Sequence, residues 1–136
     1  MAALTEGRPT PRRDDGNTWH GDAAANTKIY QGALVVNNAS GYTAQGTTAT
    51  DLIALGVALE EVDNTGGANG AKKVPYRKGT WLFKNDGTHT CDRTHIGKTV
   101  YIVDDQTVAS TDGTGTRSAA GVCRDVDAQG VWVEIS

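Results

Sequence analysis

Several residue types are scarce in this chain. Its 136 residues include two cysteines, three prolines, one methionine and one phenylalanine. No apolar run approaches the ~20 residues that span a bilayer, and the first residues lack the basic start and apolar stretch of a secretion signal. We therefore expect synthesis in the cytoplasm, no membrane partner, and Cys91 and Cys123 as reduced thiols.

The chain also lacks a strong excess of charge. Its formal net charge is −3, which gives no general attraction to nucleic acid or to anionic membranes. The composition therefore predicts no direct nucleic-acid partner for the chain as a whole.

Glycine and threonine are abundant, with 17 glycines. Threonine and valine with many glycines favour pleated strands joined by tight turns. Ile53, Leu55, Val57 and Leu59 alternate as one buried face of a strand, although a helix over residues 50–59 is the competing interpretation. We predict an all-β fold, a small β-barrel or sandwich of about eight or nine short strands, as a single domain over residues 21–136. The sequence shows no convincing internal repeat.

Some single residues give finer predictions about these strands. Gly32 lies inside a predicted strand over residues 29–36 and indicates a bulge or a close backbone approach. Pro75 lacks an amide donor, so its strand is expected at a sheet edge or a bulge. Gly56 is small enough for another segment to approach closely. Gly130 follows Asp127 in a hairpin turn and suits a positive φ.

Residues 1–20 differ from the rest of the chain. They are polar and carry Pro9, Arg12 and Arg13, with Leu4 and Trp19 as their large apolar residues. Such a segment cannot bury enough surface to fold alone. We predict an extended N-terminal arm that orders against a neighbouring subunit, with Trp19 as an anchor. The alternative is a disordered tail.

The residue types that carry chemistry do not form a recognisable pattern. His89, Cys91 and His95 are possible zinc ligands, but their spacing matches no common zinc signature. No serine stands in a nucleophile elbow, and the paired carboxylates are adjacent in sequence, so in a strand they point to opposite faces. We therefore predict that the protein is not an enzyme and holds no metal or cofactor.

The middle of the chain has a local positive excess. The basic residues that we take as candidate partner-binding groups are Lys72, Lys73, Arg77 and Lys78. They could protect an edge strand from aggregation, meet an acidic part of a neighbouring subunit, or line a nucleic-acid groove whose binding weakens with salt.

Several segments resemble the small capsid decoration, or cement, proteins of tailed bacteriophages. They include Leu55-Gly-Val-Ala58 and Gly130-Val-Trp-Val133, and the full set covers residues 28–36, 39–42, 55–58, 61–67, 96–108, 117–122 and 130–133. The resemblance implies a β-rich protein on the outer surface of an icosahedral head within the virion. It also implies a homotrimer that bridges neighbouring subunits of the major capsid protein and stabilises the shell.

Two other functions stay open at this point. One is a virion surface recognition module that binds host glycans or envelope through Trp81 or Trp132, although these tryptophans also suit a core or a subunit interface. The other is a different structural part of the virion, such as a head–tail or baseplate component.

Overall fold

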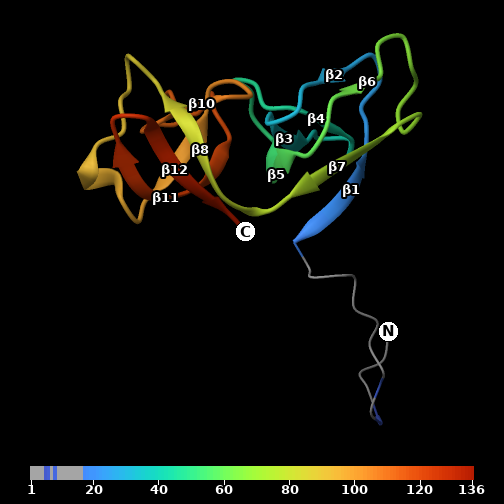
Figure 1. Cartoon of the computed structure of the whole chain (residues 1–136), viewed down its shortest axis with the longest axis horizontal. Coiled ribbons are helices and arrows are strands. Elements are labelled where there is room, and N and C mark those ends of the chain that lie inside the picture. Colours follow the sequence, from blue (N-terminus) through green and yellow to red (C-terminus); the bar gives the residue numbers. More distant parts are fainter. Residues whose placement is uncertain (1–4, 7, 9–16) are drawn as a thin grey trace.

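The computed structural model describes residues 5, 6, 8 and 17–136. Within them the chain forms twelve short strands and one short 3-10 helix, which confirms the all-β prediction and corrects the predicted number of eight or nine strands. The strands gather in two lobes side by side, and the C-terminus lies near the junction between them (Figure 1).

The first lobe, which we call the sheet lobe, is an antiparallel five-stranded sheet in the order β1-β7-β5-β3-β4. A two-stranded sheet of β2 and β6 completes it. Its strands are β1 (Thr18–Asp22), β2 (Lys28–Ile29), β3 (Leu34–Asn37), β4 (Thr43–Gln45), β5 (Ile53–Ala58), β6 (Val62–Asp63) and β7 (Lys73–Arg77).

The second lobe is a closed five-stranded barrel in the order β10-β8-β12-β11-β9. The parallel pairing of β8 with β10 completes the ring, and this closure confirms the predicted barrel. Its strands are β8 (Gly79–Asn85), β9 (Thr99–Ile102), β10 (Thr107–Ala109), β11 (Ala119–Asp127) and β12 (Gly130–Ile135), with the 3-10 helix η1 (Arg93–His95) in the loop before β9.

The last hairpin shows how the sequence builds the barrel wall. Val131, Val133 and Ile135 are buried on one side of β12, and Trp132 lies on the other, half-buried. The period of two places the valines and the isoleucine in the barrel core. The predicted turn is confirmed, because Gly130 has a φ of +146° at the start of β12.

The two lobes share the same strand topology. Without β2 and β6, which are additions, the sheet lobe has five strands in chain order, β1, β3, β4, β5 and β7, and the barrel has β8 to β12. In each lobe the first strand pairs with the fifth, the fifth with the fourth, the fourth with the second, and the second with the third. The first and third strands, β8 and β10, are parallel neighbours in the barrel. In the sheet lobe the corresponding strands, β1 and β4, are connected by a parallel bridge between Ala23, just past β1, and Thr43. The structure therefore contains a repeat of topology that is not visible as a repeat in the sequence.

The register of the paired strands shows which residues occupy the same position in the two lobes. A Cβ on Gly56 would lie 2.3 Å from the carbonyl oxygen of Arg77, and a Cβ on Gly121 would lie 2.3 Å from that of Glu134. Thr18 pairs with Arg77, and Thr80 pairs with Glu134. The next residue along each first strand is a tryptophan, so Trp19 of the sheet lobe corresponds to Trp81 of the barrel.

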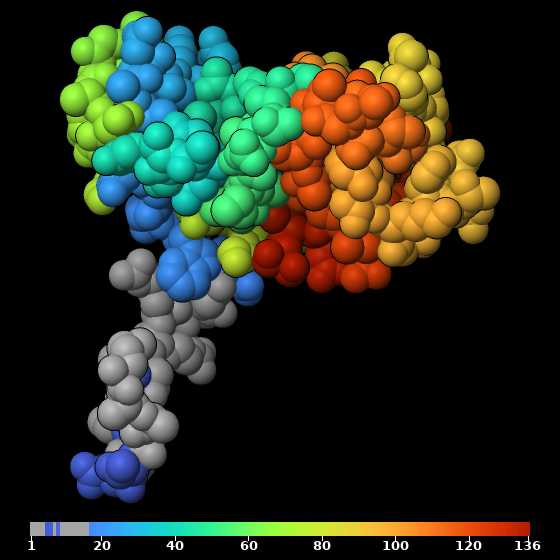
Figure 2. Space-filling view, turned by 180° about the vertical axis from the view of Figure 1, so that it is seen from behind, coloured from blue at the N-terminus to red at the C-terminus, as the bar shows by residue number. Residues whose placement is uncertain are grey.

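Strands β3 and β5 join the two lobes into one body. Leu34 and Val57 belong to the same buried cluster as the barrel side chains, whereas Val35 and Ala58 belong to the cluster of the sheet lobe. Successive side chains of a strand point to opposite faces, so these strands contribute to both cores. Figure 2 shows the two lobes in contact from behind.

The strand predicted over residues 53–59 is present as β5, but its predicted buried face is wrong. Ile53 is 66% exposed and Leu59 is 38% exposed. The pairing of β3 with β5 shifts register beside Gly56, and the close approach predicted at this glycine is confirmed by the nearby Arg77 carbonyl. The shift moves Ala54 and Val57 to the same side, against the barrel core.

Other local predictions are corrected by the structure. The segment 29–36 is not one strand, because the chain turns at Gly32, with a φ of +87°, between β2 and β3. Pro75 lies in β7 between β1 and β5, so its strand is not an edge. Leu59, just past the end of β5, donates its amide to the carbonyl oxygen of Pro75, so Pro75 lies where the ladder between β5 and β7 ends and its missing amide interrupts no further pair.

Candidate interaction surfaces

The structure describes five of the eight predicted partner-binding residues. Pro9, Arg12 and Arg13 lie outside the described residues. Trp19 lies in β1, so the last three residues of the predicted arm belong to a strand of the sheet lobe. The basic residues lie in β7 or next to it, beside β1: Lys72, Lys73, Arg77 and Lys78.

Trp19 and the basic side chains of β7 point to opposite faces of the sheet. Trp19 pairs with Tyr76 and packs, partly buried, against the core of the sheet lobe. Lys73 pairs with Asp22 across the strands and makes an ion pair with its carboxylate. Directly opposite residues share a face of the sheet, so Trp19 and Lys73 cannot contact the same flat partner surface. The packing gives Trp19 a role inside its own lobe, like that of Trp81 in the barrel.

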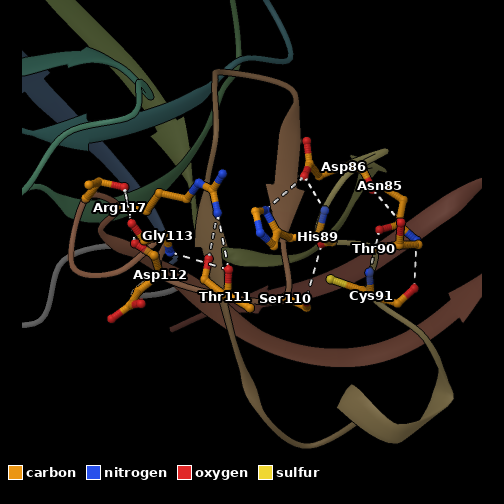
Figure 3. A network of polar contacts seen from close by, with 11 residues as sticks. Asn85, Asp86, His89, Thr90, Cys91, Ser110, Thr111, Asp112, Gly113 and Arg117 are labelled. Carbon is orange, nitrogen blue, oxygen red and sulfur yellow. Dashed lines mark hydrogen bonds and ion pairs between the residues drawn. The ribbon is translucent and has the colours of Figure 1, made fainter.

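Two of the three possible zinc ligands, His89 and Cys91, lie in a polar network of the barrel loops (Figure 3), and the third, His95, lies in η1. The amide and carbonyl groups of Cys91 both bond to the Asn85 side chain, at 2.8 Å each. The carbonyl oxygen of His89 accepts from the amide of Ser110 at 2.9 Å. His95 accepts the amide of Asp92 through Nδ1 at 2.9 Å and caps η1. Within the described part of the chain, no three His, Cys, Asp or Glu side chains gather as a metal site.

Both cysteines are unpaired and buried in the barrel core. Burial raises the pKa of the Cys91 thiol to about 11, and the nearby Cys123 and two aspartates add to this effect. Burial also raises the pKa of the Cys123 thiol. Both thiols therefore stay protonated at neutral pH and serve as core side chains.

Trp81 and Trp132, the two tryptophans considered for glycan binding, are both partly buried and have their indole N–H groups bonded within the chain. Trp81 donates to the carbonyl oxygen of Arg77 at 3.2 Å, and Trp132 donates to the carboxylate of Asp127 at 3.0 Å. The second bond is the largest cause that holds the pKa of Asp127 below its usual value. Each indole N–H therefore already has a hydrogen-bond partner within the chain, Trp81 with a residue of the sheet lobe and Trp132 with a residue of the barrel.

An apolar groove of about 280 Å³ lies between the lobes on the side of the C-terminus. The exposed Ile53 lies at its rim. The lining comes from β5, β11 and the end of β12: Leu52, Ile53, Ala54, Ala119, Ala120, Gly121, Val122, Glu134, Ile135 and Ser136.

A second hollow, which we call the junction hollow, lies where two turns of different lobes meet. It has a volume of about 390 Å³ and is lined by Tyr30, Gln31, Gly32, Ala33, Asp105 and Gln106. Tyr30 is 56% exposed, and burial raises the pKa of the Asp105 carboxyl, with a further contribution from Asp104. In the sequence Asp105 is only one of several paired carboxylates, and nothing in the linear pattern connects it with Tyr30.

Comparison of the chain with models of known protein families, with curated proteins and with solved structures found no match. Among the described residues, no helix has the length and apolar character that a membrane crossing requires.

Proposed function

We propose that this protein is a bacteriophage capsid decoration protein. In this proposal it binds the outer surface of the icosahedral head as a homotrimer and bridges neighbouring subunits of the major capsid protein. The proposal rests first on the resemblance of segments such as Leu55-Gly-Val-Ala58 to decoration proteins. The all-β fold is the class that the resemblance implies.

One structural observation supports a mechanical role above the others. Strands β3 and β5 place Leu34, Val36 and Val57 in the barrel core and Val35 and Ala58 in the core of the sheet lobe. Protein interiors are close-packed and transmit strain. A force applied to one lobe therefore reaches the other through shared strands and not through a flexible linker, as a clamp between two capsid subunits needs.

A trimer of this kind does not need a tight single contact. An interface of ~1,600 Å² ranges from micromolar to picomolar affinity according to the quality of its central contacts. Three linked sites raise overall avidity by ~10²–10⁴ when the geometry lets all three bind together. Moderate binding by each copy is therefore enough to hold the protein on a shell.

The direct test uses expanded shells assembled from the major capsid protein of the same phage. The recombinant chain is mixed with these shells, co-sedimented, and located by cryo-electron microscopy. We expect saturable binding at three-fold positions on the outer surface and a higher temperature of shell disruption. A chain that stays in the supernatant, or that is found at the head–tail joint or baseplate of intact virions, would overturn the proposal.

The predicted partner-binding residues are tested in the same assay. A deletion of residues 1–16 removes Pro9, Arg12 and Arg13 but keeps β1 intact, and we expect it to fold and to bind shells more weakly. Charge reversal of Lys72 and Lys78 together tests the basic residues, and charge reversal of the exposed Lys84 and Lys98 together, on the barrel, is the matched control. If the deletion variant and the charge-reversal variant both bind shells as well as the control does, neither the N-terminal residues nor the basic residues belong to the interface.

A further inference from the structure

The junction hollow is held by backbone hydrogen bonds from both lobes. The amide of Leu34 donates to the carbonyl oxygen of Asp105 at 2.8 Å, and the amide of Lys84 donates to that of Gln106 at 2.7 Å. The amide of Gly32 donates to the carbonyl oxygen of Ala58 at 2.9 Å. These bonds fix both walls to β3, β5 and β8, so the hollow is formed before any ligand arrives.

The chemistry of the hollow is that of a site for a cation. The Asp105 carboxylate is half-buried and makes no ion pair with any described residue. Asp104 lies next to it and uses one carboxylate oxygen to accept the amide of Gln106 at 2.9 Å. A carboxylate that is partly withdrawn from water and has no positive partner attracts a cationic group strongly.

The tyrosine on the opposite wall adds a face for such a group. The Tyr30 ring is exposed, and the ammonium group of Lys28 already lies 5.2 Å from its centroid. The same ammonium group is 4.0 Å from the Glu61 carboxylate, so the charge of Lys28 already has an acidic partner other than Asp105. An aromatic ring attracts cations through its negative face.

We propose that the junction hollow binds an arginine side chain of a partner protein, with the Asp105 carboxylate accepting from the guanidinium and the Tyr30 ring packed against its plane. The site deepens the proposed function, because it names the chemistry that the hollow would recognise on the capsid surface, and it rests on that function for the identity of the partner.

Three properties favour arginine over other ligands. Its planar guanidinium donates in a fork that fits a carboxylate and also stacks on an aromatic ring, whereas a lysine ammonium is a compact and strongly hydrated charge. The side-chain amide oxygens of Gln31 and Gln106 offer further acceptors at the rim. An anion would be repelled by Asp104 and Asp105. The volume of about 390 Å³ lies within the range of small-ligand sites, ~300–1,000 Å³.

The test is a titration of the full-length protein with N-acetyl-arginine amide, followed by the backbone amide resonances of Gly32 and Gln106. We expect both resonances to shift, with a Kd on the order of 1–10 mM for a single side chain. The neutral isostere N-acetyl-citrulline amide should bind about tenfold or more weakly, because it cannot make the charged contact. Equal shifts with the two probes, or no shift at these amides with the arginine probe, would overturn the proposal.

Variants assign the binding to the two named side chains. Asp105→Asn and Tyr30→Leu should each weaken binding of the arginine probe, by about tenfold for the aspartate, while Tyr30→Phe keeps the ring and the affinity. Asp51→Asn is the matched control, because it removes the same charge from an exposed residue whose φ of +62° asparagine tolerates well. If Asp51→Asn weakens the probe as much as Asp105→Asn, the effect is one of net charge and the site is wrong.

Two further measurements separate this proposal from a small-molecule site and from the proposed capsid function. Free L-arginine carries two additional charges, and clearly tighter binding of it than of the amide would make the hollow a small-molecule site and overturn the protein partner. The shell assay tests the proposed function independently: a chain that binds the arginine probe but no shell contradicts the capsid role and not the hollow. A chain that binds shells without any response to the probe contradicts the hollow alone.

Discussion

The barrel joins its five strands into a closed ring, whereas the sheet lobe uses the same strand topology and leaves β1 and β4 as its outer strands. In the barrel, β8 and β10 pair through two residues of each strand. In the sheet lobe, the corresponding contact is the single bridge from Ala23 to Thr43. One topology therefore supports both a sealed barrel and a more open lobe covered by β2 and β6.

The difference between the lobes lies in how each core is completed. The barrel core is closed by its own strands together with Leu34, Val36 and Val57 from the sheet lobe. The core of the sheet lobe includes Ile29 of β2 and Val62 of β6, the added pair of strands. The barrel core is thus completed by residues of the sheet lobe, while the core of the sheet lobe is completed by its own added strands, β2 and β6.

The largest effects are expected from matched truncations in the two cores. Ile102 in the barrel and Ile29 in the sheet lobe are both fully buried, and Ile→Ala in a core costs about 2–5 kcal/mol of unfolding free energy. We expect both variants to lower one shared unfolding transition, because β3 and β5 belong to both cores. Urea unfolding followed by tryptophan fluorescence and by circular dichroism measures this. Two separate transitions would show that the lobes unfold independently.

The equivalent tryptophans give the next test. Trp19→Ala and Trp81→Ala each remove a partly buried indole that packs on a core, and we expect each to cost about 2–4 kcal/mol, below or near the range for full burial. Thermal unfolding of the two variants side by side measures this. A Trp19 variant with unchanged stability would break the equivalence and return Trp19 to the role of an anchor for a partner.

The equivalent glycines sharpen the comparison at the backbone. An alanine at position 56 or 121 would bring its Cβ to 2.3 Å from a carbonyl oxygen of the fifth strand, so the strands must separate locally. We expect losses of about 1–3 kcal/mol, larger at Gly56 because its φ is +156°. Gly87→Ala is the control, since nothing lies within 4 Å of its added Cβ. Unfolding midpoints that match the control would refute the close approach of the strands.

Exposed ion pairs should give the smallest effects. The barrel has Arg124 with Glu134, whose Nε and Oε1 atoms are 2.7 Å apart, and the sheet lobe has Lys73 with Asp22. Both pairs are solvent-exposed, so a double-mutant cycle should give about 0.2–1 kcal/mol for each and less at high salt. A coupling well above this range in one lobe would indicate a larger network around that pair.

The sequence predicted most strands of the barrel, because each lies in one continuous stretch that turn residues bound. Val131, Val133 and Ile135 show the pattern clearly. Prediction failed where the pairing of two strands shifts register and the alternation of buried and exposed side chains is interrupted. At Gly56 the register shift turns Ile53 outward, and the period of two cannot reveal a shift that depends on the neighbouring strand.

The repeat was missed for a related reason. Asn17-Thr-Trp19 and Gly79-Thr-Trp81, together with Gly56-Val57 and Gly121-Val122, are the residues that correspond in the two lobes. Such short matches carry little weight in a linear comparison. Their meaning becomes visible only when the pairing of strands places each at the same position of the same topology.

The sequence by itself determined that the chain is all-β, with a small barrel or a sandwich as its predicted architectures, because alternation and turn residues act locally. Only the tertiary structure decided that two lobes repeat one topology, that Trp19 packs inside its own lobe, and that Tyr30 and Asp105 meet at one hollow. Those features depend on contacts between residues far apart along the chain. Strand order and register set such contacts, and a single sequence does not display either of them.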